Sequence, residues 1–106
     1  MKTISAIELN LLLEQADNSL FLLDVREPHE FEHCHISTSH LMPMRSIPDR
    51  LDQLPKNAPI VTICHHGMRS QQVAQFLIQN GFNDITNLVG GVNAWAADVD
   101  RAMPTY

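Results

Sequence analysis

The amino-acid sequence predicts one α/β domain built around a parallel sheet. Short apolar segments alternate with segments of helical spacing along the chain, which is the pattern of α/β proteins. The apolar segments 20–25 and 60–63 are almost continuously hydrophobic, as expected of strands covered on both faces. The length of 106 residues suits one domain. No repeat, linker or low-complexity tract divides the chain, so residues 1–106 are treated as one unit.

The first half of the chain is predicted to contain two helices and one strand. Residues 5–8 have the capping-box pattern, which opens a helix of about ten residues with Ile7 and Leu11 on its apolar side. A strand follows over residues 20–25. The proline after Glu27 then favours the first turn of a short helix over residues 28–33.

The second half is predicted to contain turns, two strands and two longer helices. Four prolines between residues 42 and 59 favour turns around one short helix capped by Ser46. The elements beyond them are a strand over residues 60–63, a helix over residues 70–80 that stops at Gly81, a strand over residues 84–89 and, after the Gly90–Gly91 turn, a helix that Trp95 anchors in the core.

Composition and charge argue against several classes of function. Seven Lys and Arg against twelve Asp and Glu give a formal charge of −5, which repels a phosphate backbone, so no nucleic-acid partner is expected. No apolar stretch reaches the roughly 18 residues of a membrane span. Glu8 and Glu14 interrupt the leucine-rich N-terminal segment, so we expect no export signal. These features predict a cytoplasmic protein whose Cys34 and Cys64 are free thiols.

Cys64 is the strongest candidate for a chemical role. It follows the predicted strand 60–63 at the edge of the sheet where ligands bind. The residues after it lead into a helix N-terminus, whose free amides favour an anionic thiolate. Gly67 allows the loop to curl, and Arg69 supplies a permanent charge suited to an oxyanion. A buried structural cysteine is the alternative, but this combination favours a nucleophile.

Four separated segments resemble the rhodanese-like sulfurtransferases in order and spacing. They are residues 24–31 (Asp-Val-Arg-Glu-Pro-His-Glu-Phe), residues 35–36 (His-Ile), residues 64–70 (Cys-His-His-Gly-Met-Arg-Ser) and residues 88–95 (Leu-Val-Gly-Gly-Val-Asn-Ala-Trp). The resemblance covers nearly the whole chain. It implies a rhodanese-like three-layer fold, in which helices flank a five-stranded parallel sheet, with an active-site loop from Cys64 to Arg69.

The resemblance also implies a reaction. The loop cysteine would accept a sulfane sulfur as a persulfide, commonly from thiosulfate. A thiophilic acceptor would then take the sulfur: cyanide in the standard assay, and a thiol or thioredoxin-like protein in the cell. Attack of a thiolate on a divalent sulfur is the chemistry of thiol–disulfide exchange, and sulfite is a good leaving group. Such covalent catalysis requires no cofactor and no metal.

The remaining site residues follow from their place in the loop or from the resemblance. The predicted substrate-binding residues are His65, His66, Gly67, Met68 and Arg69. The two histidines are expected to shape the mouth of the pocket and to add positive charge there. The resemblance implies a loop-supporting set of Asp24, Arg26 and Ser70. The six histidines show no paired Cys/His spacing, so no metal site is expected.

Two other functions and one local departure stay open. A related phosphatase or arsenate reductase has a Cys-x5-Arg loop, whereas four residues separate Cys64 from Arg69 here. A rhodanese-like binding or sensing module commonly lacks the loop cysteine that this chain has. The family often has Gly-His-Ile-Pro-Gly-Ala where residues 34–39 read Cys-His-Ile-Ser-Thr-Ser. That departure leaves open the backbone of the turn and any redox role of Cys34.

Overall fold

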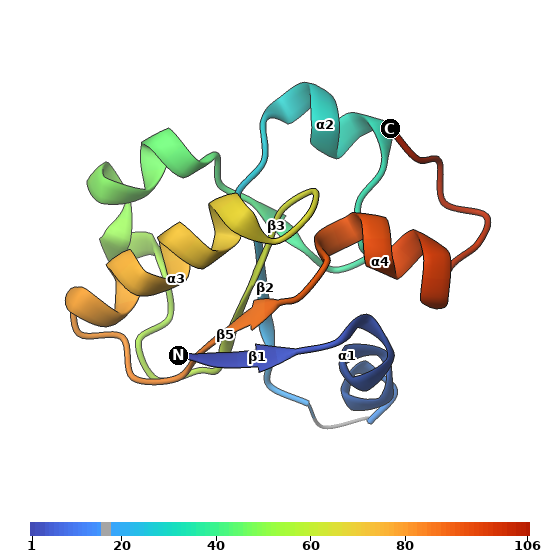
Figure 1. Ribbon diagram of the computed structural model, residues 1–106. Coiled ribbons are helices and arrows are strands. Elements are labelled where there is room, and N and C mark those ends of the chain that lie inside the picture. Colours follow the sequence, from blue (N-terminus) through green and yellow to red (C-terminus); the bar gives the residue numbers. More distant parts are fainter. Residues whose placement is uncertain (16–17) are drawn as a thin grey trace.

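Five parallel strands form one sheet in the order β1-β5-β4-β2-β3 (Figure 1). The computed structural model describes residues 1–15 and 18–106. The strands are β1 (Lys2–Ile4), β2 (Phe21–Asp24), β3 (His40–Leu41), β4 (Ile60–Ile63) and β5 (Ile85–Leu88). The α/β class and the five-stranded parallel sheet expected from the sequence are therefore confirmed.

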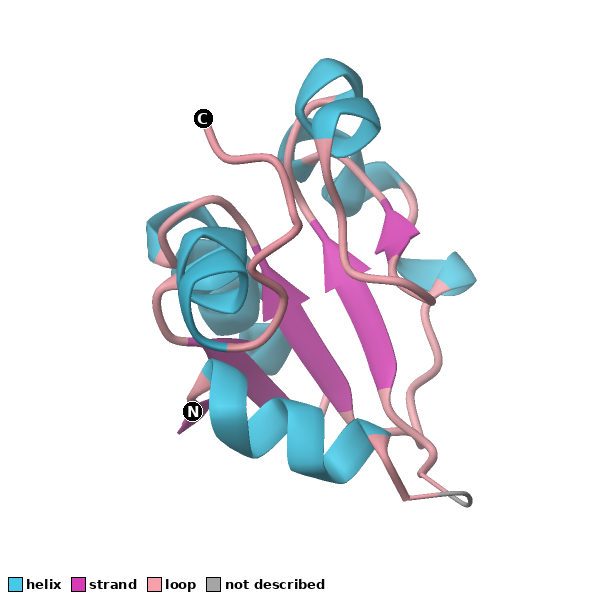
Figure 2. Ribbon diagram, turned by 90° about the vertical axis from the view of Figure 1, so that its right-hand side faces the viewer, coloured by secondary structure: helices cyan, strands magenta, loops and turns pink. Residues whose placement is uncertain are grey.

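Helices cover both faces of this sheet (Figure 2). Helices α1 (Ala6–Leu13) and α4 (Gly91–Asp98) contact each other on one face. Helix α3 (Met68–Gln79) packs on the other face with the 3₁₀ helices η1 (Met44–Asp49) and η2 (Leu51–Gln53). The short α2 (Pro28–His33) follows the carboxyl end of β2. No helix in the described part of the chain is long and apolar enough to cross a membrane.

The sheet separates two apolar clusters because neighbouring strand residues point to opposite faces. Leu22, Val61 and Ile63 belong to the cluster under α1 and α4. Leu23 and Ile60 belong to the cluster under α3 and the 3₁₀ helices. All four residues of β4 are buried, which confirms the prediction of a central strand covered on both sides.

The strand register brings three carboxyl ends together at one edge of the sheet. Asp24 at the end of β2 pairs with Ile63 at the end of β4. Thr62 of β4 pairs with Asn87 of β5. Cys64 is the first residue beyond β4. The polar side chains of β2 and β5 therefore flank the candidate nucleophile.

Helix α1 buries a different face from the predicted one. Ser5 and Glu8 make both hydrogen bonds of the capping box, as expected. However, Ile7 and Leu11 are 56% and 60% exposed, while Leu9 is completely buried. The helix carries apolar residues all around its circumference, so local pattern does not select the buried face. Packing against α4 and the sheet selects Leu9 instead.

Smaller differences concern element boundaries. The apolar pattern did not predict the strands β1 and β3, because they have only three and two residues. Helix α3 begins at Met68, two residues earlier than predicted. Ser46 lies inside η1 and donates to the carbonyl of Pro43 at 2.7 Å, so it does not cap that helix. Gly81 has the expected left-handed backbone, with φ +91°, and Trp95 is buried as expected.

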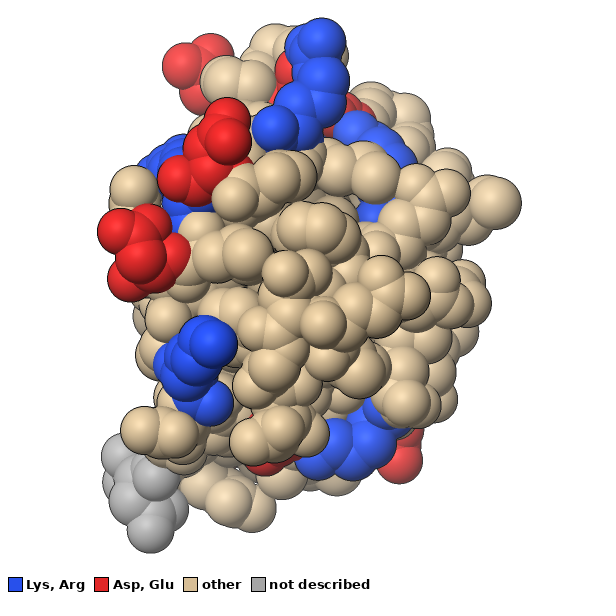
Figure 3. Space-filling view, turned by 90° about the vertical axis from the view of Figure 1, so that its left-hand side faces the viewer, with Lys and Arg blue, Asp and Glu red and all other residues tan. Residues whose placement is uncertain are grey.

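One face of the molecule carries few charges. Figure 3 shows a broad uncharged area with Lys, Arg, Asp and Glu around its edges. Helix α3 explains part of this composition, because Arg69 is its one charged residue. Its exposed positions include the glutamines Gln71, Gln72, Gln75 and Gln79.

The segment 34–39 contains one strained backbone position. Thr38 has φ +72° and is the one non-glycine residue with positive φ in the described chain. A β-branched side chain is disfavoured in this left-handed region. Thr38 occupies the position of the second glycine in the Gly-His-Ile-Pro-Gly-Ala pattern of the rhodanese-like sulfurtransferases. Cys34, which replaces the other glycine, has extended backbone with φ −164° and carries no such strain.

We expect Thr38→Gly to raise the free energy of unfolding by about 0.5–1 kcal/mol. The free energy gained by relieving the strained backbone at positive φ exceeds the free energy lost because glycine makes the unfolded chain more flexible. The matched control is Ser37→Gly in the same exposed turn, which brings flexibility without relief and should lower stability by about 0.5–1 kcal/mol. Urea unfolding measures both values. Equal destabilisation by the two glycines would show that Thr38 is unstrained.

Candidate active site

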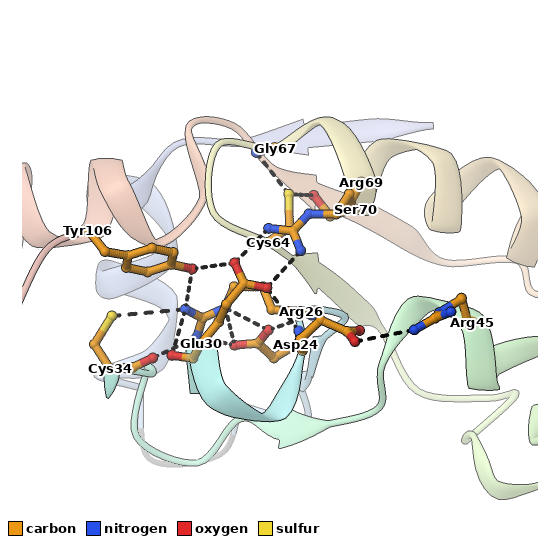
Figure 4. Close-up of polar contacts among 11 residues, drawn as sticks. Asp24, Arg26, Glu30, Cys34, Arg45, Cys64, Gly67, Arg69, Ser70 and Tyr106 are labelled. Atoms are coloured by element: carbon orange, nitrogen blue, oxygen red, sulfur yellow. Dashed lines mark hydrogen bonds and ion pairs between the residues drawn. The ribbon is translucent and has the colours of Figure 1, made fainter. Parts of the chain in front are cut away.

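Cys64 lies at the centre of the carboxyl edge of the sheet, directly after β4. The residue is 0% exposed. Its Sγ accepts a hydrogen bond from the amide of Gly67 at 3.0 Å and lies 3.2 Å from the hydroxyl of Ser70 (Figure 4). An amide and a hydroxyl directed at one sulfur stabilise negative charge on it. The sequence placed Ser70 among supporting residues, whereas in the structure Ser70 contacts the sulfur itself.

The loop curls at Gly67, which confirms the conformational expectation for this residue. Gly67 has φ +106°, and a Cβ added there would lie 3.3 Å from the amide nitrogen of Gly90. The carbonyl of Gly67 accepts a hydrogen bond from the side chain of Asn87 at 3.1 Å. The backbone is therefore held on one side by β5 while its amide points at the sulfur.

The start of helix α4 holds the first part of the loop. The amides of Val92 and Asn93 donate to the carbonyls of Cys64 and His65 at 2.9 and 3.1 Å. This approach is so close that a Cβ on Gly91 would fall 2.2 Å from the carbonyl oxygen of Cys64. The glycine pair that was expected only to turn the chain therefore also allows α4 to support the loop.

Asn87 is a site residue that sequence reasoning missed. Its Oδ1 lies 2.5 Å from the Ser70 hydroxyl and accepts from Thr62 at 3.2 Å. Ser70 has one hydroxyl hydrogen, so it can donate either to Asn87 or to the sulfur of Cys64 at a given moment. Donation to the sulfur is favoured when the sulfur is charged. The sequence feature that could have identified Asn87 is a polar side chain near the end of an otherwise apolar strand.

Asp24 and Arg26 form an ion pair with no exposed surface on either side chain. The Arg26 guanidinium donates to both carboxylate oxygens, at 2.7 to 3.1 Å, and to the carbonyl of Cys34 at 2.7 Å. Burial by itself would lower the pKa of Arg26, but hydrogen bonds with Asp24 and Tyr106 outweigh it and raise that pKa. The contacts of this pair reach the loop indirectly, because the ring of Tyr106 stacks on His65.

Arg69 is engaged by a carboxylate that the sequence analysis did not single out. Its two terminal nitrogens donate to the two oxygens of Glu30 at 2.8 and 3.0 Å. The Arg69 hydrogen bond lowers the pKa of Glu30 to about 2, against its ordinary 4.5. The same contact raises the pKa of Arg69. Glu30 belongs to the quoted segment 24–31, but its partner could not be read from that segment.

Tyr106 joins the C-terminal end of the chain to the site. Its hydroxyl donates to Glu30 at 3.0 Å and accepts from Arg26 at 2.8 Å. Its ring lies 3.8 Å from that of His65, at an interplanar angle of 9°. No pattern in the sequence indicated a role for Tyr106.

The other loop side chains differ in exposure and charge. Burial, followed by the electrostatic effect of the neighbouring His66, lowers the pKa of His65 from its ordinary 6.5. This shift disfavours the charged form of His65 and so runs against the expectation that His65 adds positive charge. His66 and Met68 are exposed and line an open hollow beside the loop. Met68 is 74% exposed.

Cys34 is a second buried thiol, and neither cysteine is in a disulfide. Its sulfur lies 3.9 Å from a terminal nitrogen of Arg26. Figure 4 shows Cys34 on the far side of Arg26 from the loop that carries Cys64. Within residues 1–15 and 18–106, no three His, Cys, Asp or Glu side chains cluster so as to hold a metal ion.

The chain is similar to known proteins over almost its whole length. The Rhodanese-like domain family matches residues 5–98. Thiosulfate sulfurtransferase GlpE from Coxiella burnetii is 32% identical over 96 residues, which cover 91% of this chain and 88% of that protein. The crystal structure of a rhodanese-like domain protein from Staphylococcus aureus has a TM-score of 0.86 and 33% identity, covering 100% and 99% of the two chains.

A longer relative contains a similar region. The maize adenylyltransferase and sulfurtransferase MOCS3-1 is 35% identical over 92 residues. The match covers 80% of this chain and 20% of the maize protein. This chain therefore spans about a fifth of that relative.

The low pKa of Glu30 predicts a pH-dependent contribution to stability. A carboxyl whose folded pKa is about 2, against 4.5, stabilises the fold fully above about pH 5 and loses that effect as the pH falls through 2. The difference in unfolding free energy between wild type and Glu30→Gln should therefore shrink steadily from about pH 5 to pH 2. Chemical denaturation across this range measures it.

The control is Glu32→Gln, at an exposed position of the same helix. It should change stability by less than about 0.5 kcal/mol across the range. A Glu30→Gln difference that is equally large at pH 5 and pH 2 would contradict the coupling of this ion pair to folding.

Proposed function

Because the chain belongs to the rhodanese-like domain family, we propose that it is a sulfurtransferase that carries a sulfane sulfur on Cys64. The observation that carries the proposal is the sulfur of Cys64, held between the Gly67 amide and the Ser70 hydroxyl at the carboxyl edge of the sheet. Relatives named thiosulfate sulfurtransferase support thiosulfate or a similar small anion as the donor.

In the first half-reaction the Cys64 thiolate attacks the outer sulfur of thiosulfate. A sulfur–sulfur bond forms to Cys64, and the bond between the two sulfurs of thiosulfate breaks. Sulfite leaves with the electron pair of that bond, so a thiolate and a dianion give a persulfide anion and a sulfite dianion. The Ser70 hydroxyl and the Gly67 amide are placed to stabilise negative charge on the sulfur before and after transfer.

In the second half-reaction an acceptor takes the terminal sulfur. Cyanide attacks it, the persulfide bond breaks, and thiocyanate leaves while Cys64 becomes a thiolate again. A thiolate from a small molecule or a thioredoxin-like protein would take the same sulfur and become a persulfide itself. Residues of this chain and the two substrates supply all the atoms and electrons, so the proposed cycle uses no cofactor or metal.

The proposed setting is the cytoplasm. Cys34 and Cys64 are both free thiols, and a persulfide carrier with two free thiols suits a reducing compartment. The chain's formal charge of −5 also makes a small anionic donor or a thiol acceptor a better proposal than nucleic acid.

The test is transfer of sulfur to Cys64. After incubation with thiosulfate and removal of excess reagent, mass spectrometry of the intact wild-type protein should show one added sulfur atom. Cys64→Ser should show none and should form no thiocyanate with cyanide, because a serine hydroxyl cannot hold a persulfide. Cys34→Ser is the matched control and should gain the sulfur like wild type.

Two outcomes would contradict the proposal. Folded Cys64→Ser protein that still produces thiocyanate would place the chemistry elsewhere. Cys64-dependent hydrolysis of an aryl phosphate, without sulfur transfer, would favour the phosphatase alternative. We expect no such hydrolysis, because the four residues between Cys64 and Arg69 form a shorter loop than a Cys-x5-Arg phosphatase loop.

Arg69→Ala should lower kcat/KM for thiosulfate about tenfold or more, the effect of losing one charge-assisted hydrogen bond to the donor. The control is Arg45→Ala, which removes an arginine whose side chain is 91% exposed and 3.7 Å from Glu27. Thiosulfate:cyanide kinetics of both variants provide the comparison. Equal kcat/KM in Arg69→Ala and wild type would show that Arg69 serves only the ion pair with Glu30.

A further inference from the structure

The sulfur of Cys64 has no open path for a donor in this conformation. The residue is 0% exposed, so some neighbouring group must move before a reagent can reach it. The loop backbone is a poor candidate for this movement. The carbonyls of Cys64 and His65 are bonded to the first turn of α4, and the carbonyl of Gly67 is bonded to Asn87. Side chains next to the sulfur are the groups that can move without breaking the fold.

Arg69 is the most suitable of these side chains. Figure 4 shows its guanidinium between Cys64 and the carboxylate of Glu30. The proximity of its charge to Cys64 is reflected in the pKa of Arg69, which Cys64 helps to raise after the larger effect of Glu30. The Arg69 side chain is 37% exposed, against 12% for Glu30. Arg69 therefore has room to turn, whereas Glu30 does not.

Glu30 binds Arg69 with the same geometry that an oxyanion would use. Two carboxylate oxygens accept from two terminal nitrogens of the guanidinium, at 2.8 and 3.0 Å. Guanidinium forms the same two-pronged contact with carboxylate, phosphate and similar oxyanions. An anionic donor that needs Arg69 must therefore compete with a carboxylate already present in the protein.

Other hydrogen bonds to Glu30 reduce the free-energy cost of separating its carboxylate from Arg69. Its Oε1 also accepts from the amide of Glu27 at 3.0 Å, and its Oε2 accepts from the hydroxyl of Tyr106 at 3.0 Å. Each oxygen keeps one hydrogen bond when Arg69 leaves. No unsatisfied carboxylate remains, so the usual cost of separating a partly buried ion pair is reduced.

We propose that Arg69 changes partner during the reaction, from the Glu30 carboxylate to the anionic end of the donor, and that Glu30 thereby sets how strongly the site prefers anionic reagents. This deepens the proposed function and rests on it. Glu30 is a positioning and specificity-determining residue in this scheme, because it acts on the donor through Arg69. Removing its charge frees Arg69 and strengthens the preference for anions.

The test compares alkylation of Cys64 by iodoacetate, an anion, and iodoacetamide, its neutral analogue. Both form the same sulfur–carbon bond and release iodide. The ratio of their rates therefore measures how strongly the site prefers an anionic reagent to a neutral one. Peptide mapping confines the measurement to Cys64. Glu30→Gln should raise the iodoacetate/iodoacetamide ratio about three- to tenfold, the effect of removing one partly screened charge. It should also lower KM for thiosulfate more than it changes kcat.

Three further variants separate partner exchange from general electrostatics. Glu32→Gln changes the net charge equally and should leave the ratio unchanged. Arg69→Gln should lower the ratio below that of wild type. The double variant Glu30→Gln/Arg69→Gln should lose the rise caused by Glu30→Gln, since the effect depends on Arg69. If Glu30→Gln does not fold, Glu30→Asp takes its place: its carboxylate is one methylene shorter, which loosens the contact with Arg69 without changing the net charge, and the ratio should rise.

An unchanged ratio in folded Glu30→Gln, or an equal rise in the double variant, would overturn the partner exchange. An unchanged ratio in Arg69→Gln would do the same. Alkylation does not depend on sulfur transfer, so the two proposals can fail separately. The expected ratios without persulfide formation would contradict only the proposed function. Persulfide formation with unaltered ratios would contradict only the exchange.

Discussion

The buried ion pair between Asp24 and Arg26 is the constraint on which the candidate site depends. Burying a guanidinium away from water destabilises a fold unless its N–H groups donate hydrogen bonds to acceptors in the protein. Those of Arg26 reach Asp24, the backbone carbonyls of Glu30 and Cys34, and the hydroxyl of Tyr106. One arginine therefore joins the end of β2, helix α2, the segment after it and the C-terminal end of the chain. Its bonds to the Glu30 carbonyl and the Tyr106 hydroxyl hold both residues beside the loop.

The loop that carries Cys64 is held from two directions. On the side of the sheet, Asn87 and the first turn of α4 bind its backbone. On the side of α2, contacts are made through side chains, with Tyr106 stacked on His65 and Glu30 paired with Arg69. The backbone that presents the Gly67 amide to the sulfur is thus fixed by hydrogen bonds of its own, whereas the contacts on the side of α2 can change by side-chain rotation alone.

This division suits the proposed role of Cys64, whose sulfur must be stabilised as an anion and also be reached by a donor. Donors already directed at the sulfur need no reorganisation when negative charge develops on it, which is the basis of electrostatic catalysis. Complete burial of Cys64 would stop the reaction if the whole loop were equally rigid. In the proposed exchange, the partly exposed Arg69 resolves this conflict, because it turns toward an incoming anion while the amide of Gly67 remains in place.

Local pattern was enough to predict the α/β class, the buried central strands, the capping box and the curl at Gly67. Each of these depends on residues close together in the chain, and the family resemblance added the five-stranded sheet. Local pattern was not enough for the buried face of α1, because that helix is apolar on every side. Nor could it identify the partner of Arg69 or the positions of Asn87 and Tyr106. Glu30 and Arg69 are 39 residues apart, and Arg26 and Tyr106 are 80 apart. Such contacts arise only when the strands align and bring distant segments to one edge of the sheet.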